Sequence, residues 1–440
     1  GGGGGGRRQS SGSGGGFNVN WDGSWQVATT RDGEGWYAEF RIPFSTLRYG
    51  SGGAQRWGFN VTRRIRRNNE ESFWSPVARQ FNVFRLSSAG VLEGFDAPAR
   101  RTGTFTPYLL GSGRRVYAAN SSPEDDNNGD VGFDLKLVSA ASLTLDLTYN
   151  TDFAQVEVDN QQVNLTRFSL LFPEKRPFFL ENAGFFTVGG RGADLFFSRN
   201  IGIADGEQVP IRGGARLSGR AGGFNVGLLH IQTNGADRVQ PDNSYSVARV
   251  ARELPNRSRV GVLFIDRNGE ASGDYNRTYA ADARVAIGEP VTLSSFVART
   301  QTPGLSANEH AYDANAAWAS RSWDASVAIR EIGENFNPEV GFVPRDGYRS
   351  YSTRVQRFVR PDGFLREIRP HMSFDTFRSR RTGVEKGFEE SSRLHLDTHW
   401  EWPDGMVVFT TANRIREGLF EPFEISGTDV VVAPETYDGW

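Results

Sequence analysis

The chain has 440 residues, a formal net charge of −2 and no cysteine. A charge this close to neutral provides no bulk electrostatic field for binding nucleic acid. The lack of cysteine excludes thiolate metal sites, cysteine nucleophiles and disulfide frameworks. The mean hydropathy is −0.49, and no apolar run approaches the roughly 18 to 20 residues that a membrane helix needs. A membrane β-barrel stays open, because each of its strands is only half apolar.

The two ends of the chain predict a fragment of a longer protein. Residues 1–16 are rich in glycine and serine, which predicts a flexible linker of low complexity. The chain begins in this run without Met and stops at "YDGW", directly after an apparent strand. We therefore expect sequence to be missing at both ends, so the lack of a signal peptide is uninformative.

Residues 17–97 predict short strands separated by turns. In "WYAEFRIPF" apolar and polar residues alternate, which indicates a strand with one buried face, and "RWGFNVTRRIRR" alternates in the same way. Strands of this length and spacing predict a β-sandwich. The residues expected to face its core are Trp36, Ala38, Phe40, Ile42, Trp57, Phe59 and Val61.

Three other tryptophans of this region, Trp21, Trp25 and Trp74, are candidates for carbohydrate binding. Sugar rings stack on exposed aromatic faces, and an indole offers a large one. The alternative is that these side chains are core residues. Alternation favours the core for Trp36 and Trp57 but leaves the facing of the three candidates open.

From residue 104 onward, loop length is the main signal. Long polar loops alternate with short connections at 221–223, 254–257, 288–290, 320–322, 361–363 and 403–405. An up-and-down barrel of the outer-membrane type has short turns at one end and long loops at the other. The alternation therefore predicts such a barrel, whereas a large soluble β-domain such as a propeller is the alternative.

The strands agree with this prediction. In "YAADARVAI" Asp282 and Arg284 share one face, and apolar residues occupy the other, as in a barrel with an apolar outside and a polar inside. The expected fold class is all-β, with a partial β-sandwich at 17–97 followed by a large antiparallel barrel at 104–440 that is incomplete at its C-terminus. Aromatic residues near strand ends predict an interfacial girdle, made of Tyr279, Trp318, Trp323, Tyr348, Tyr351, Trp400 and Trp402.

The segment at 151–186, "TDFAQVEVDNQQVNLTRFSLLFPEKRPFFLENAGFF", combines many charges with many phenylalanines. Its part "FPEKRPFFLE" has two prolines and four charges, which excludes a normal lipid-facing strand. We expect residues 150–190 to fold inward as a plug or brace whose charges pair inside a partly wet lumen. The expected charge network comprises Asp152, Glu157, Asp159, Arg167, Glu174, Lys175, Arg176 and Glu181.

The same segment offers a catalytic alternative. Glycoside hydrolysis needs two carboxyl groups at a fixed separation, which the sequence does not define. The candidates for such a pair are Glu157, Asp159, Glu174 and Glu181. Asp152, together with Glu157 and Asp159, could instead surround Ca²⁺, and no other cofactor is expected.

The histidines are His230, His310, His371, His395 and His399. His395 and His399 are four residues apart, a spacing that suits zinc on a helix, but "RLHLDTHWEW" alternates as a strand and contains no HExxH motif. The pattern therefore favours a lumen or interface position, and no metal site is predicted.

Two motifs resemble known families. "GWYAEFRIPFSTLRY" and "WGFNVTRRIRRNNEESFWSPV" resemble the C-terminal half of a family 9 carbohydrate-binding-module-like domain, a β-sandwich found in xylan- and cellulose-degrading enzymes. Residues 151–186, followed by "LFFSRNIG", resemble the signature of an uncharacterised bacterial family in which a domain of unknown function, expected to be an outer-membrane β-barrel, follows that sandwich. The resemblance implies a location in the outer membrane and glycan contact at a periplasmic sandwich, but no particular reaction.

Three functions are compatible with these patterns. The leading hypothesis is a non-enzymatic outer-membrane barrel for transport, surface display or polysaccharide handling, with lipid and a polysaccharide or oligosaccharide as partners. The second is a membrane-associated hydrolase that acts on O-glycosyl compounds in xylan or cellulose catabolism. The third is a soluble glycan-binding adhesin.

Overall fold

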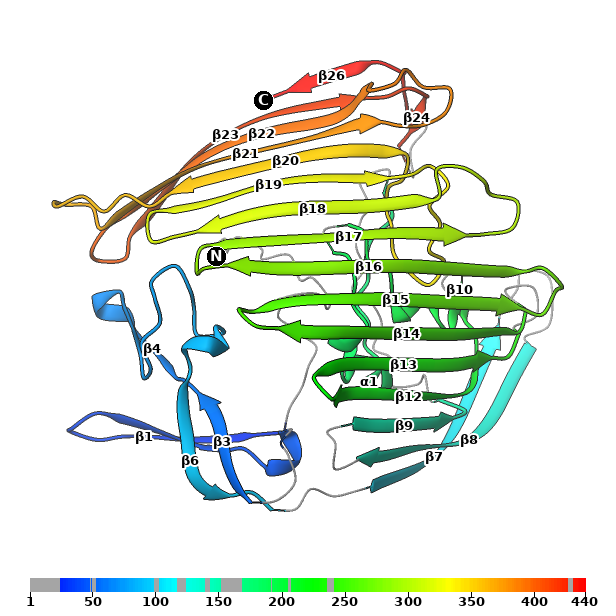
Figure 1. Cartoon of the computed structure of the whole chain (residues 1–440), viewed down its shortest axis with the longest axis horizontal. Helices are drawn as coiled ribbons and strands as arrows, with labels where there is room; N and C mark the ends of the chain where they lie inside the picture. The colour runs from blue at the N-terminus through cyan, green and yellow to red at the C-terminus, as the bar shows by residue number, and fades with distance from the viewer. Residues whose placement is uncertain are drawn as a thin grey trace.

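The structure is a computed structural model that describes residues 24–47, 49, 53–98, 103–116, 124–138, 143–151, 168–190, 192–204, 207–235, 241–425 and 430–440. Sixteen strands form one antiparallel sheet, in which consecutive strands of the chain pair side by side (Figure 1). The predicted all-β class and its large antiparallel meander are confirmed. The strands are β7 (Gly103–Val116), β8 (Glu124–Val138), β9 (Leu143–Tyr149), β12 (Ile211–Ala221), β13 (Phe224–Thr233), β14 (Asn243–Leu254), β15 (Ser258–Gly269), β16 (Tyr275–Ile287), β17 (Val291–Gln301), β18 (His310–Ala319), β19 (Trp323–Ile332), β20 (Tyr348–Arg357), β21 (Glu367–Ser379), β22 (Glu389–Glu401), β23 (Val407–Gly418) and β26 (Thr436–Gly439).

From β12 to β23, connections at the two ends of this sheet differ in length. Short turns join the strands at one end, which we call the turn end, and the predicted short connections all lie there. The first of them uses Gly222 and Gly223, whose positive φ angles of 56° and 81° suit a tight hairpin. Longer loops join the strands at the opposite, loop end. β7 and β26 are the two edges of the sheet, and no pairing joins them within the described ranges.

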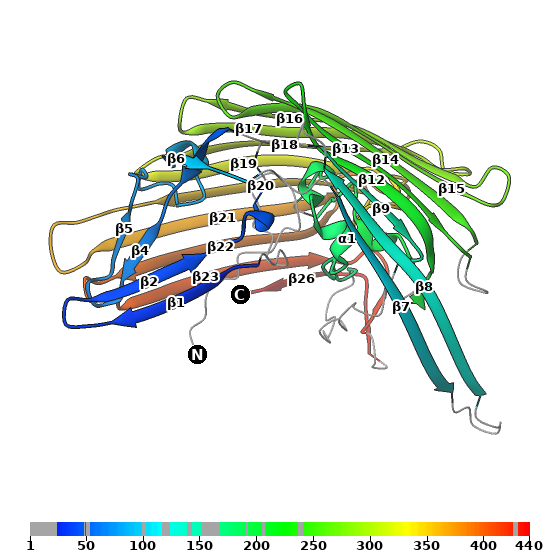
Figure 2. The ribbon, with the colours of Figure 1, turned by 90° about the horizontal axis from the view of Figure 1, so that it is seen from below.

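The sheet is curved, and its two faces carry different side chains. Figure 2 shows it as an arch, with α1 (Pro177–Leu180) on the concave side, which we call the inner face. On the convex, outer face, Val262 and Val297 are 57% and 59% exposed. On β16, Ala281 points outward, and the next residue, Asp282, points inward, where it forms an ion pair with Arg249. Period-two alternation of β-strands therefore gives the apolar outside and charged inside that the sequence predicts.

One girdle prediction is wrong. Tyr348 is buried, because its register places it opposite Ile332 and Ser379, on the inner face of β20. Its ring packs beside Phe377 there. Tyr279, Trp318, Trp323 and Tyr351 are exposed large side chains, as a girdle requires.

Residues 168–190 and 192–204, which we call the inner segment, pack against the inner face. They contain α1 and the strand β10 (Ile203–Ala204), which pairs with β11 (Glu207–Gln208). The main apolar cluster lies between this segment, the strands and the loop after β19. From the inner segment it includes Phe179, Phe186, Val188, Ala193, Leu195 and Ile201, and from the strands it includes Leu229, Ile231, Tyr245, Val247, Leu263, Ile265 and Phe296.

The region before residue 98 forms three two-stranded sheets. These pair β1 (Gln26–Arg31) with β2 (Trp36–Arg41), β3 (Ala54–Phe59) with β6 (Gly90–Asp96), and β4 (Thr62–Ile65) with β5 (Glu70–Phe73). Five of the predicted core positions are wrong, since the side chains of Trp36, Phe40, Ile42, Phe59 and Val61 are 57%, 60%, 50%, 42% and 47% exposed. Arg63 lies over the ring of Trp36. In the described residues no second sheet covers β1 and β2, so alternation alone does not bury one face. The β-sandwich stays a prediction.

The N-terminal region contacts the turn end of the large sheet. Asn69 donates from Nδ2 to Glu401 Oε1 at 2.8 Å, and Arg366 donates to the carbonyl of Asn69. Arg79 lies 3.7 Å from Glu367. A further small hairpin, β24 (Phe423–Glu424) with β25 (Val431–Val432), precedes β26. Within the described residues, no helix is long and apolar enough to cross a membrane.

Candidate functional site

Buried ion pairs are the main feature of the inner face. Arg216 on β12 lies 2.8 Å from Asp146 on β9, and Arg330 on β19 lies 2.8 Å from Asp313 on β18. Arg249 on β14 pairs with Asp282 on β16, across the strand between them. The loop residue Arg345 pairs with Glu390 on β22 at 2.7 Å. Removing any one of these partners leaves a charge with little access to water, which costs several kcal/mol.

The inner segment has its own buried charge pair. Arg176 donates to both carboxylate oxygens of Glu174, and it also donates to the carbonyls of Ile201 and Ser198. Ser198 Oγ donates to Glu174 Oε2 at 2.7 Å. Burial opposes ionisation of Glu174, but the hydrogen bonds and charge of Arg176 outweigh it and hold the pKa of this carboxyl below its usual value. The pair lies before α1, and its bonds to Ser198 and Ile201 hold it to the chain that follows α1.

Hydrogen bonds attach the inner segment to the sheet. Arg216, besides pairing with Asp146, donates from NH1 to the carbonyls of Phe178 and Glu181. Asn182 donates to Ser218 Oγ at 2.7 Å. Arg330 donates to the carbonyl of Gly190 at 3.1 Å. Arg216 and Arg330 therefore each bind both a carboxylate of the sheet and the backbone of the inner segment.

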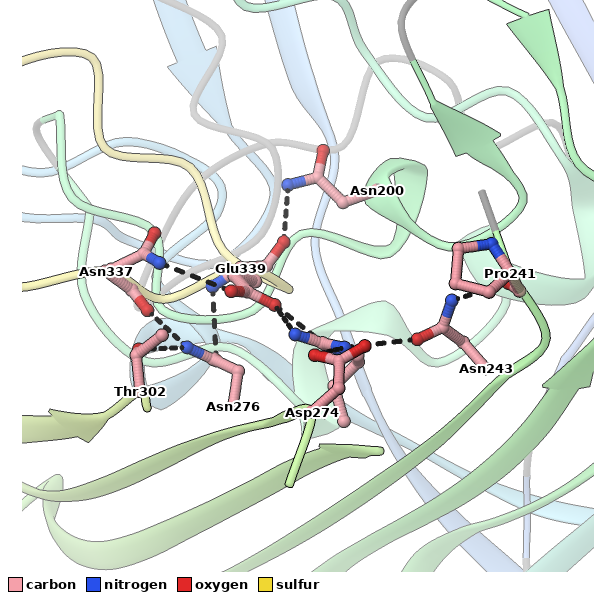
Figure 3. A network of polar contacts seen from close by, with 9 residues as sticks. Asn200, Pro241, Asn243, Asp274, Asn276, Thr302, Asn337 and Glu339 are labelled. Atoms are coloured by element: carbon pink, nitrogen blue, oxygen red, sulfur yellow. Dashed lines mark hydrogen bonds and ion pairs between the residues drawn. The ribbon is translucent and has the colours of Figure 1, made fainter. Parts of the chain in front are cut away.

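A polar network at the loop end joins the inner segment to two loops (Figure 3). Arg267 contacts Glu339 Oε2 through Nε at 2.8 Å and also pairs with Asp274. Asn276 donates to the carbonyl of Asn337 at 2.8 Å. Asn200 of the inner segment donates to the carbonyls of Glu339 and Gly341 at 3.1 and 2.6 Å. The loop between β19 and β20 is thus held down over the inner segment.

Two open clefts lie at opposite ends of this arrangement. The cleft at the loop end has a volume of about 190 Å³ and is lined by Asn200, Asn243, Arg267, Asp274 and Glu339, among others. The cleft at the turn end has a volume of about 290 Å³ and lies between residues 182–187 and the strands. Its charged lining residues are Arg220, Arg249, Glu253 and Arg259. The inner segment therefore separates two polar spaces on the same face of the sheet.

Four of the eight expected network residues lie in the described part of the chain. Glu174 pairs with Arg176, and Glu181 pairs with Lys136 of β8. The backbone N–H of Lys175 donates to Glu174 Oε1 at 3.0 Å. The remaining four, Asp152, Glu157, Asp159 and Arg167, lie outside the described residues, and so does the Ca²⁺ site considered for them.

Of the carbohydrate-binding candidates, Trp21 also lies outside the described residues. Trp25 is 53% exposed and stacks on Phe40 with a ring-centroid distance of 6.1 Å. Trp74 is 60% exposed, meets Phe59 edge to face, and lies directly over Gly90, where a Cβ atom would clash. Each indole thus has a supporting ring on one side and a solvent-facing surface.

The sequence candidates did not include the paired residues of the inner face, Arg216 with Asp146 and Arg330 with Asp313. Alternation places all four on polar faces of their strands, so that signal was present. Their pairing depends on strand register, which the sequence did not supply.

Three side chains could hold a metal ion. A nitrogen of His371, a nitrogen of His399 and an oxygen of Asp397 all lie within 4.8 Å of one another on the inner face. They come from the neighbouring strands β21 and β22, where His371 stands directly opposite Asp397.

Comparison with known proteins gives a partial family match. Residues 98–213 match the family described as domain of unknown function DUF5916, and the motif at 151–186 lies inside that range. No curated protein matches the chain.

Several solved structures are similar over most of the chain. Pseudomonas aeruginosa OpdQ is 11% identical, with a TM-score of 0.35, covering 77% of this chain and 86% of its own. OpdK with vanillate, from the same organism, is 10% identical, with a TM-score of 0.33, covering 79% and 88%. P. aeruginosa OccK11 (OpdR) is 9% identical, with a TM-score of 0.34, covering 74% and 83%. At such identities and TM-scores, the function of this chain has to come from its own residues.

Proposed function

We propose that this chain is an outer-membrane β-barrel that admits polar solutes through its interior and is closed by the inner segment. The observation that carries the proposal is the difference between the two faces of the same strands. Val260, Val262 and Phe264 are exposed on the outer face of β15, where only a lipid or another apolar phase would cover them. Charged pairs such as Arg249 with Asp282 occupy the inner face. This is the distribution that a strand needs when one side meets lipid and the other meets water.

The closure follows from how the inner segment is attached. It lies between the polar clefts at the loop end and the turn end. Its attachments to the sheet include side-chain hydrogen bonds from Arg216, Asn182 and Arg330. Such bonds contribute about 1 to 3 kcal/mol each in net terms, and displacement would also expose apolar side chains of the inner segment, such as Phe179 and Phe186, that pack on the strands. The strands keep their own ladder of backbone hydrogen bonds, so the segment can be displaced without unfolding them, at the cost of this apolar contact. Displacement would join the two clefts into one polar path.

Because the chain has no cysteine, introduced thiols can test this closure cleanly. The double variant Asn182→Cys with Ser218→Cys places two thiols where side chains now touch at 2.7 Å. A short bifunctional, reducible thiol reagent would then hold the inner segment to β12. The matched control, Gln232→Cys with Ser244→Cys, joins register partners on β13 and β14 and leaves the inner segment free.

Solute entry is measured by swelling of proteoliposomes in small neutral sugars and by conductance in planar bilayers. We expect cross-linking of the first pair to lower both quantities and reductant to restore them, while the control pair changes neither. Equal flux in the locked and released forms would overturn closure by the inner segment. No flux and no conductance in any form would overturn the channel itself.

A second candidate function is glycan binding by the N-terminal region, supported by the exposed and ring-backed indoles of Trp25 and Trp74. This region touches the turn end of the sheet through Asn69 and Arg79. In an outer-membrane barrel the short turns are periplasmic, so the proposal places glycan binding in the periplasm.

Calorimetric titration of the full chain in detergent with xylo- and cello-oligosaccharides tests this second function. Loss of one stacking indole costs about 0.5 to 1.5 kcal/mol, so Trp25→Ala and Trp74→Ala should each weaken binding several-fold. Trp323→Ala, which removes an exposed indole of the large sheet at the start of β19, should not weaken binding. Absence of binding by the unaltered chain, or equal loss in all three variants, would reject the glycan site.

The hydrolase alternative has little support at Glu174. Its two carboxylate oxygens are occupied by Arg176 and Ser198, and its lowered pKa opposes a general-acid role. Glu181 is paired with Lys136. The other two candidates, Glu157 and Asp159, lie outside the described residues.

A further inference from the structure

A cluster of histidines on the inner face is not used by the proposed channel or by the glycan site. On β22, His395, Asp397 and His399 follow one another at every second residue and therefore point to the same face. On β21, His371 stands opposite Asp397 in the register. Directly opposed residues of antiparallel strands have Cβ atoms about 4.5 to 5.5 Å apart. The topology thus brings three imidazoles and one carboxylate together from two strands.

Two atoms of the cluster that could bind a metal ion make no hydrogen bond within the described residues. His399 Nε2 lies 2.9 Å from Asp397 Oδ2, and His371 Nδ1 lies 3.7 Å from the same oxygen. Asp397 Oδ1 and His371 Nδ1 are buried and make no hydrogen bond within the described part of the chain. The side chain of Asp397 is only 9% exposed. A buried polar atom without a partner is costly and calls for an explanation, for which a bound ion is one of the ordinary answers.

A neighbouring histidine has a partner that orients its ring. His395 Nδ1 lies 2.7 Å from Asn413 Oδ1, a pairing in which the imidazole donates and Nε2 is left with its lone pair. The ring of His395 lies 4.8 Å from that of His371, and Phe409 packs edge to face on His399 at 4.4 Å. Such outer contacts fix the orientation of metal-binding imidazoles.

We propose that His371, Asp397 and His399 bind one divalent transition-metal ion of the zinc type on the inner face, with His395 beside them. Two imidazole nitrogens and one carboxylate oxygen form a ligand set that zinc accepts, and the fourth position then remains open to water or to His395. Magnesium and calcium fit less well, because both prefer sites made only of oxygen ligands. The inference stands whether or not the interior conducts solutes.

The experiment is a zinc titration of the full chain, purified in detergent without a histidine tag and stripped with chelator. Binding is followed by calorimetry and by metal content after gel filtration, and the ligand atoms by X-ray absorption at the zinc edge. We expect one zinc ion per chain, bound through nitrogen and oxygen. The variants His371→Ala, His399→Ala and Asp397→Asn should each weaken binding by roughly 10- to 100-fold or more, since even outer contacts of a metal site have effects of that size.

The other two histidines supply the matched controls. His230→Ala and His310→Ala remove an imidazole outside the cluster and should leave the affinity unchanged. Asp397→Asn keeps the shape of the side chain, and a change in gel mobility between unheated and heated samples shows whether each variant is folded. The proposal is overturned if the unaltered chain binds no zinc, or if the controls weaken binding as much as the cluster variants do.

Discussion

Arg216 is the residue whose removal tests the attachment of the inner segment most severely. Its side chain is 2% exposed and lies 2.8 Å from Asp146. It also donates to the carbonyls of Phe178 and Glu181. One guanidinium group therefore binds both the Asp146 carboxylate and the backbone beside α1. The variant Arg216→Met keeps most of the side-chain volume but removes every donor.

Breaking a buried ion pair from one side costs about 3 to 5 kcal/mol, since the other charge is left without its partner. Lys136 remains 3.9 Å from Asp146 and still compensates part of its charge. We therefore expect a destabilisation at the lower end of this range, a fall of about 3 kcal/mol in the free energy of unfolding. Urea titration in lipid vesicles, followed by tryptophan fluorescence, measures it. Conductance in planar bilayers should rise in the same variant, because the inner segment has lost one of its attachments.

Two further variants complete this test. Arg416→Met breaks a pair with Asp438 whose two side chains are 37% and 43% exposed, and the attraction between such exposed charges is largely screened by water, so we expect little change in stability. Asp146→Leu combined with Arg216→Met removes both buried charges and should recover part of the loss. If Arg216→Met changes the free energy of unfolding no more than Arg416→Met does, the reasoning about the buried pair is refuted.

Three other predictions concern the inner segment and its packing. Burial raises the pKa of Asp194 to about 6, against the opposing charge of Arg330. The protonated acid is therefore favoured in the fold, and this contribution to stability is complete below about pH 4 and lost as the pH rises through about 6. Asp194→Asn should remove about 2 to 3 kcal/mol of pH dependence across that window, and parallel pH profiles of unfolding for the two proteins would contradict it. Glu174→Gln, whose parent carboxylate has a lowered pKa, should cost about 3 kcal/mol at pH 7 and less at an acid pH below that lowered pKa, where the parent is protonated as well. An equal cost at both pH values would count against the charge pair. In Gly214→Ala the new Cβ would lie 2.2 Å from Ile231 Cδ1 and 2.7 Å from the His230 carbonyl, so unfolding should become easier by about 1 to 3 kcal/mol. Gly363→Ala meets no atom within 4 Å and should stay within about 0.5 kcal/mol, so equal effects would show that the packing argument fails.

Local signals predicted the large sheet well. Turn residues such as Gly222 and Gly223 and the alternation in "YAADARVAI" act over a few residues, and the structure follows both. The outward and inward sides of β16 were predicted correctly because a side-chain period of two depends only on the strand itself. Tyr348 was wrong since its position near a strand end did not reveal which face it occupies.

Features that depend on distant parts of the chain were not predictable in the same way. Arg216 and Asp146 are separated by 70 residues, and their meeting depends on the register between β9 and β12. The histidines on β22 were expected at a lumen or interface position of a strand, but the opposite His371 enters only through the pairing of β21 with β22. The burial of Trp36 was predicted from alternation alone, which fails here because no second layer covers the strand within the described part of the chain.

The central claim is that the outer face of the sheet meets lipid while the inner face lines a polar interior. Spin labels on single cysteines test it most directly, since the chain has no cysteine of its own. Val262 and Val297 are outward, and Ser294 is inward, opposite Arg284 and Asn315. In lipid vesicles we predict that labels at Val262→Cys and Val297→Cys are reached by oxygen and not by a water-soluble nickel chelate, and that the label at Ser294→Cys shows the reverse. Access of the nickel chelate to both outward labels would contradict a membrane-spanning sheet.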